Sequence, residues 1–157
     1  MLQKLFKTVV AFAIAIALTW IPSFAAPSAL ADKYAGLEFA IQPGTGDFVQ
    51  FQSGPIIEGH KTAVYYDSLR VSTPANPDCP PNKYLEGVKG YVMPDNSGEV
   101  EEFALGSLKY YVVVGYFTPT CIDGSDTIQM WFTGTDGAEK CYDSNFSQNY
   151  TFPVICK

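Results

Sequence analysis

Short runs of alternating or continuous apolar residues recur along the chain from residue 37 onwards, and turn-forming residues separate them. Successive side chains of a strand point to opposite faces of a sheet, so this pattern predicts β-strands. The expected strands span residues 37–41, 48–51, 62–66, 88–92, 99–103, 110–117, 127–133 and 150–155. Strands at roughly ten-residue spacing, without a convincing helical period, predict an all-β, antiparallel β-sandwich of immunoglobulin-like type.

Three segments depart from simple alternation. Residues 110–117 form the most apolar run, centred on Val112, Val113 and Val114, and this composition predicts a strand buried on both faces. Residues 72–82 are rich in proline, which fixes φ and removes a hydrogen-bond donor, so a loop pinned by its cysteine is expected. Residues 101–108 could instead form a short helical turn, which would leave the fold class unchanged.

Residues 1–31 have the features of a secretory signal peptide. Lys4 and Lys7 give a positive start, residues 9–18 are an uninterrupted apolar run, and small residues end the segment. The apolar run is shorter than the roughly 20 residues that span a bilayer. We therefore expect export, without membrane insertion of the mature chain.

The cleavage site sets the start of the folded part. An A-x-A pattern fits best at Ala31 and also fits at Ala25, and we expect the mature chain to begin at Asp32. The remainder has the size of one domain, so a single secreted or periplasmic domain is expected over residues 32–157.

Charge excludes two classes of partner. The sequence has 10 basic and 16 acidic residues and a net charge of −6. Removing Lys4 and Lys7 leaves 8 basic residues against 16 acidic ones, a net charge of −8. An acidic surface repels phosphate groups, so neither nucleic acid nor an anionic lipid surface is an expected partner.

The cysteines indicate disulfides. Cys79, Cys121, Cys141 and Cys156 all follow the expected cleavage point, as suits an oxidising compartment. We expect two disulfides that staple the domain, and three connectivities are open. A zinc site is the alternative, although the sequence has no CxxC pair and a single histidine, His60. We expect no metal and no cofactor.

The most informative pattern closes the chain. Residues 141–154 read Cys-Tyr-Asp-Ser-Asn-Phe-Ser-Gln-Asn-Tyr-Thr-Phe-Pro-Val. This run resembles the signature of starch-binding modules, in which an aromatic residue, Asp, Asn-like residues, Gly and Asn-Tyr close a hairpin. It departs from that signature at Tyr142, Ser144 and Ser147, where Trp, Asn and Gly are usual. With the Tyr-Asp-x-x-Arg sequence at residues 66–70, the chain also resembles a family of small secreted bacterial domains of unknown function.

The resemblance implies a β-sandwich of the starch-binding-module type as the alternative to the immunoglobulin-like one, and a non-catalytic module that binds a neutral polysaccharide such as an α-glucan. Flat rings match the apolar face of a sugar, and amide and carboxylate groups bind its hydroxyls. The residues that would do so are Trp131, Tyr142, Asp143, Asn145, Asn149 and Tyr150. Their alternative role is structural, because a strand Trp often packs in a core and residues 143–145 suit a tight turn. The competing function is a secreted or envelope domain that interacts with a protein partner or has a structural role.

Catalytic patterns are weak, so an enzyme is not expected. His60 lies in an expected turn without a nucleophile-elbow sequence. Glu101 and Glu102 would point to opposite faces of a strand, which argues against a catalytic carboxylate pair. Asp123 and Asp126 offer oxygen ligands for calcium but lack the spacing of an EF-hand loop, so we interpret them as part of a solvated turn.

Overall fold

The computed structural model of the chain describes residues 35–157 except 73–78, 80–85, 96, 123–124 and 137–138. The expected signal peptide and its cleavage site lie outside the described residues. The elements are β1 (Ala35–Ile41), β2 (Phe48–Gln52), β3 (Ile56–Ile57), β4 (Thr62–Asp67), η1 (Ser68–Ser72), β5 (Glu86–Pro94), β6 (Glu101–Lys109), β7 (Val112–Phe117), β8 (Thr127–Asp136), β9 (Glu139–Asp143) and β10 (Tyr150–Ile155). The predicted all-β class is confirmed. No helix within the described residues has the length and hydrophobicity that a bilayer span requires.

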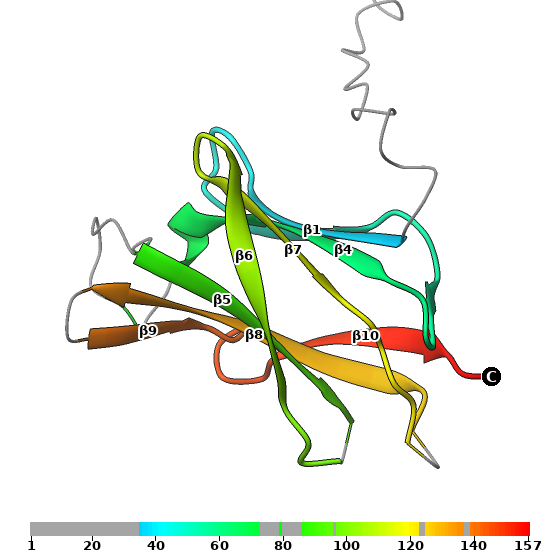
Figure 1. Cartoon of the computed structure of the whole chain (residues 1–157). Helices are drawn as coiled ribbons and strands as arrows, with labels where there is room; N and C mark the ends of the chain where they lie inside the picture. Colours follow the sequence, from blue (N-terminus) through cyan, green and yellow to red (C-terminus); the bar gives the residue numbers. More distant parts are fainter. Residues whose placement is uncertain (1–34, 73–78, 80–85, 96, 123–124, 137–138) are drawn as a thin grey trace, which may run out of the picture.

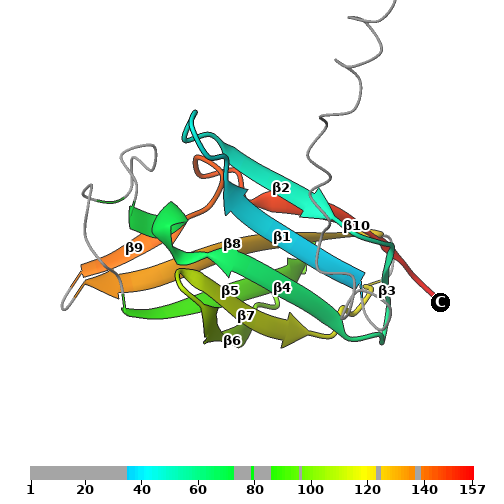
Figure 2. The same ribbon diagram turned by 90° about the horizontal axis from the view of Figure 1, so that it is seen from above.

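The strands form one sheet that curls into a half-barrel. Neighbouring strands follow the order β2-β1-β4-β7-β6-β5-β8-β10-β3, and β9 pairs with the end of β8. β1 and β4 lie in an upper layer, β8 and β10 lie in a lower layer, and β6 runs between the two (Figure 1). Figure 2 shows the same sheet from above.

This topology differs from the antiparallel sandwich predicted from the sequence. β1 pairs with β4 and β10 pairs with β3 in parallel, so the sheet is mixed. A single strand path also does not confirm two separate sheets packed face to face. Parallel neighbours need a long crossover instead of a tight turn, and the sequence carries no local signal for such a connection.

Each run that predicted a strand corresponds to an observed strand, and several strands extend further. The predicted hairpin around residue 96 is confirmed, since Tyr91 pairs with Glu102 across β5 and β6. The helical alternative for residues 101–108 is wrong, because they lie within β6. Two strands were missed: β3 is very short, and the turn signals at residues 134–137 hid the continuation of β8 towards β9.

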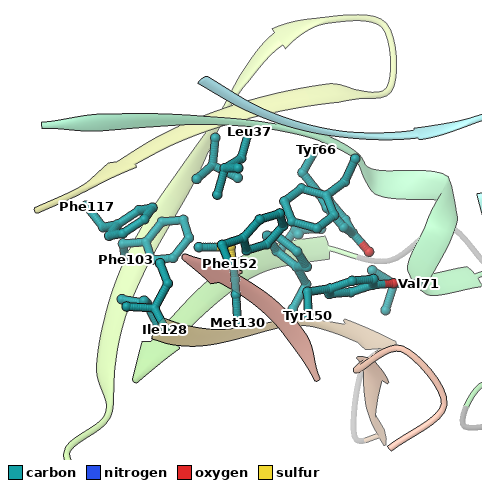
Figure 3. Close-up of a cluster of buried hydrophobic side chains, with 14 of the residues drawn as sticks. Leu37, Tyr66, Val71, Phe103, Phe117, Ile128, Met130, Tyr150 and Phe152 are labelled. Atoms are coloured by element: carbon teal, nitrogen blue, oxygen red, sulfur yellow. The ribbon is translucent and has the colours of Figure 1, made fainter. Parts of the chain in front are cut away.

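Aromatic rings fill the space between the two layers (Figure 3). Tyr66 stacks on Phe132 with ring centroids 4.0 Å apart, and Phe39 meets Phe132 edge-on at 4.7 Å. Gly90 lies directly beneath the ring of Phe103, where an added Cβ would come within 2.1 Å of a ring carbon. Glycine therefore lets Phe103 lie flat on the inner face of β5.

Two disulfides staple the fold. Cys79 pairs with Cys141, and Cys121 pairs with Cys156, at sequence separations of 62 and 35. This selects one of the three open connectivities, and it excludes the zinc alternative because no cysteine is free. Most of the predicted proline-rich loop at 72–82 lies outside the described residues; Cys79, which is described, is bonded to Cys141 in β9.

β7 is covered on one face. Val113 and Phe117 pack against the core, whereas Val112 and Val114 are half-buried and Tyr116 is 43% exposed. The prediction that this strand is buried on both faces is therefore wrong for the single chain.

Candidate functional site

Arg70 is completely buried beneath the closing segment of the chain. Its Nε donates to Oδ2 of Asp143 over 3.0 Å, and its Nη2 donates to the hydroxyl of Tyr150 over 2.6 Å. The Asp143 carboxylate also accepts hydrogen bonds from the Tyr66 hydroxyl at 2.9 Å and from the Tyr150 hydroxyl at 2.5 Å. We call these four residues the buried cluster. Figure 3 shows Tyr66 and Tyr150 approaching from opposite layers.

Arg70 also connects the two ends of the strand path. Its Nη1 donates to the carbonyl of Ala40 in β1 over 2.7 Å and to the carbonyl of Val49 in β2 over 3.0 Å. Asp143 and Tyr150 of the buried cluster belong to β9 and β10, and these strands do not pair with β1 or β2 in the described sheet. The guanidinium lies 4.3 Å from the ring centroid of Phe48. One cation thus fastens strands that backbone hydrogen bonds leave apart.

Burial controls protonation in this cluster. Removal from water, followed by the negative charge of Asp143, raises the pKa of Tyr66 well above its ordinary value. The pKa of Tyr150 is raised for the same two reasons. Burial opposes the charged form of Arg70, but the negative charge of Asp143 outweighs it and raises the Arg70 pKa. Both tyrosines therefore stay protonated and donate at neutral pH, which is the arrangement of a closed structural cluster.

Aromatic side chains line the outward face of β5, β8 and β9. Tyr91 and Trp131 are directly opposed on β5 and β8, and their rings stack with centroids 5.5 Å apart and planes 7° apart. The Lys140 ammonium lies 5.2 Å from the ring centroid of Tyr91 and 5.3 Å from that of Tyr142. We call these four residues the aromatic row. Trp131 is half-buried and Tyr142 is 39% exposed, so the row is open to solvent.

A chain of polar groups borders the aromatic row along β8. Nδ2 of Asn149 donates to Oε1 of Gln129 over 3.0 Å, and Nε2 of Gln129 donates to the carboxylate of Asp95 over 2.6 Å. Gln129 shares the outward face of β8 with Trp131, because residues two apart in a strand point the same way. We call Asp95, Gln129 and Asn149 the polar chain.

A second polar pair lies on the β6 side of the row. The Glu102 carboxylate accepts a hydrogen bond from the Tyr91 hydroxyl over 3.0 Å and forms an ion pair with Lys89 over 2.6 Å. Donors and acceptors therefore flank the stacked rings on both sides.

A strained loop joins β9 to β10 beside these residues. Asn145, Phe146, Ser147 and Asn149 all have positive φ, at 49°, 57°, 67° and 58°. L-residues rarely adopt this conformation, and Asn tolerates it best. The backbone N–H of Asn149 donates to the carbonyl of Ser144 over 2.7 Å and closes the turn. The tight turn expected from this polar sequence is present, and it is a left-handed one.

The six residues predicted as a site lie on two sides of the sheet. Asp143 and Tyr150 are 3% and 2% exposed within the buried cluster, out of reach of a surface ligand. Trp131 and Tyr142 belong to the outward aromatic row. Asn145 and Asn149 lie in the left-handed loop, where their amides hydrogen-bond to protein partners.

Several residues of the buried cluster and of the aromatic row were not predicted from the sequence. Alternation in residues 88–92 already places Tyr91 on the outward face, but its stacking on Trp131 depends on strand pairing between distant segments. Arginine is rarely buried completely, so the burial of Arg70 has no local signal. The Tyr-Asp-x-x-Arg sequence and the closing segment were singled out separately, and the structure brings them together in the interior.

The residues considered for catalysis or metal binding are scattered in the part of the chain that the structure describes. The described residues contain no group of three or more His, Cys, Asp or Glu side chains that could hold a metal ion. His60 is exposed, with Nε2 2.9 Å from the Lys157 ammonium. Residues 123 and 124 of the calcium candidate lie outside the described residues, and Asp126 is exposed.

The family described as "Family of unknown function (DUF6209)" matches residues 39–155. The match includes every member of the buried cluster and of the aromatic row. No curated protein and no solved structure matches the chain.

Proposed function

We propose that this chain, which belongs to the DUF6209 family of unknown function, is an exported, non-catalytic domain that binds a neutral polysaccharide through its aromatic row. The observation that carries the proposal is the outward Trp131, which stacks on Tyr91 and lies two positions after Gln129 of the polar chain. An apolar surface beside amide and carboxylate groups is the combination that a sugar ring needs.

The expected affinity follows from buried area. A sugar ring that covers roughly 80 Å² of apolar surface gains about 2 kcal/mol. The row offers the half-buried Trp131 and the exposed Tyr142 at two positions, which suits a ligand of several linked sugars. After the cost of association, we expect dissociation constants in the micromolar to millimolar range.

The buried cluster has a supporting role in this proposal. Asp143 directly follows Tyr142, and its bond to Arg70 fixes the end of β9 from below. The polar chain holds Asn149 against β8. The resemblance of residues 141–154 to starch-binding signatures makes an α-glucan the first ligand to test.

Export is part of the same proposal. The signal-peptide pattern of residues 1–31 supports it, and so do two disulfides in a chain with no free cysteine.

Affinity electrophoresis in gels that contain soluble starch or glycogen tests the binding. The chain should be retarded, and Trp131→Ala and Tyr142→Ala should reduce the retardation while their circular dichroism stays unchanged. Tyr110→Ala is the matched control, because Tyr110 is 86% exposed at the β6–β7 turn, outside the row. No retardation on either glucan, or equal loss in the Tyr110 control, would count against the proposal.

A protein-interaction domain is the second candidate function. The exposed ring of Tyr116 and the half-buried Val112 and Val114 on the outward face of β7 favour it, since soluble chains rarely leave such a face uncovered.

A further inference from the structure

The outward face of β7 continues across three neighbouring strands. Residues paired across a sheet point to the same side, so Val114 shares its face with Tyr65 of β4, Glu38 of β1 and Phe51 of β2. Phe51 is 61% exposed, while Tyr65 and Val114 are half-buried. We call this surface the β2-β1-β4-β7 face.

The next rows of the same face are also mostly apolar. Tyr116 is opposite Ala63, which is opposite Gly36, so one row combines an exposed ring with two small residues. Val112 is opposite Asp67. Antiparallel sheets with one solvated face normally alternate apolar and polar residues, and β7 does not. A face of this composition is built to be covered.

We propose that the β2-β1-β4-β7 face is the contact between two copies of this chain, packed face to face. Sheets pack on one another at about 10 Å when both inner faces are apolar.

The charges on β4 favour a second copy as the occupant. Lys61 precedes β4 and lies over the outward ring of Tyr116, 4.2 Å from its centroid, while Asp67 ends the strand on the same face. Consider a two-fold axis that lies between the two sheets, runs perpendicular to β4 and crosses it at its middle. This axis brings Lys61 of one copy opposite Asp67 of the other. The same contact then forms twice, as in any isologous interface.

The size of the face fits a reversible dimer. Four strands at about 4.8 Å spacing and six residues at about 3.3 Å give a footprint of roughly 20 Å by 20 Å. This is about 400 Å² on each copy and about 800 Å² in total, below the area of stable interfaces, so the contact should be transient, with a dissociation constant of tens to hundreds of micromolar.

Sedimentation of the purified chain between about 1 and about 200 µM measures the association directly. We expect a concentration-dependent monomer–dimer equilibrium. Val114→Glu should weaken it by roughly tenfold or more, because it adds a second carboxylate to the central row that already holds Glu38. Val100→Glu is the matched control, since Val100 is 51% exposed outside this face, and it should leave the equilibrium unchanged.

A zero-length carbodiimide cross-link identifies the partner surface in the unaltered chain. Lys61 and Asp67 stand roughly 20 Å apart along β4, too far for a cross-link within one copy. A peptide that joins Lys61 to Asp67 must therefore come from two copies, and we expect it in the dimer band. A chain that stays monomeric at all concentrations, a dimer insensitive to Val114→Glu, or a dimer without this cross-link would overturn the proposal.

Discussion

Arg70 shows what a single buried charge can do in this fold. Its guanidinium connects β1 and β2 to β9 and β10. In a complete barrel, backbone hydrogen bonds between strands would make this connection. Breaking a buried ion pair by removing one partner leaves the other charge without compensation.

We therefore predict that Arg70→Met lowers the free energy of unfolding by about 3–5 kcal/mol. The double variant Arg70→Met/Asp143→Leu should recover part of this loss, because neither buried charge remains. Denaturant titration of the single and double variants measures both effects. A loss below about 1 kcal/mol for Arg70→Met would contradict the assigned role.

Protonation of Tyr66 and Tyr150 gives a prediction at alkaline pH. Both pKa values are raised in the folded chain, so the folded state retains these protons when the unfolded state begins to lose them near pH 10. The stabilising contribution is therefore complete below about pH 10 and declines as the pH rises further. Absorbance of tyrosinate during a pH titration should show exposed tyrosines ionising first, and these two ionising only with unfolding. Replacing both by Phe should remove the delayed fraction.

At the residue scale, sequence reasoning identified the right segments but not the direction of their side chains. Asp143 and Tyr150 look like ligand contacts in the sequence, whereas their burial depends on Arg70, some 70 to 80 residues earlier in the chain. Contacts of that separation are set by strand pairing, which one sequence does not report.

At the scale of elements, the β9–β10 loop stores conformational strain. Three consecutive residues, from Asn145 to Ser147, have positive φ, and none is glycine. Phe146 is 65% exposed, so its side chain contributes little burial to offset the cost.

Phe146→Gly should therefore raise the free energy of unfolding by about 0.5–1 kcal/mol, because glycine adopts this conformation without a Cβ clash. Phe146→Ala, which keeps the Cβ, should not stabilise the chain and serves as the control. Thermal unfolding of the two variants separates these effects. Equal stability of the two would show that the strain is not local to this backbone position.

Strand positions were predictable because hydrophobic alternation is local, but strand order was not. The parallel pairing of β1 with β4 places segments some 27 residues apart side by side. The extension of β8 beyond residue 133 depends on β9, whose own sequence is too polar to indicate a strand.

At the scale of the whole molecule, the two disulfides act on different parts of the sheet. In the loop-entropy account, bonds that close loops of 62 and 35 residues each contribute about 4 kcal/mol. Cys141 also lies two positions before Asp143, so loss of its bond loosens the strand that carries the buried carboxylate.

Cys79→Ser/Cys141→Ser should therefore destabilise the fold more than Cys121→Ser/Cys156→Ser. Urea denaturation of the two double variants gives the comparison. A larger loss in the second variant would indicate that β9 is held by the buried cluster alone.

The molecule thus has two outward surfaces with different chemistry: the aromatic row on β5, β8 and β9, and the apolar face on β2, β1, β4 and β7. The first is proposed to bind sugar and the second to pair copies, and each proposal can fail without the other.

Tryptophan fluorescence reports whether the aromatic row binds sugar. The sequence has two tryptophans, and once residues 1–31 are removed only Trp131 remains as a reporter. Titration with maltoheptaose should change the Trp131 emission with a saturable curve, and Tyr142→Ala should shift the midpoint to higher concentration. Emission that stays constant up to millimolar sugar, with the chain folded, would contradict the claim that the aromatic row is a binding surface.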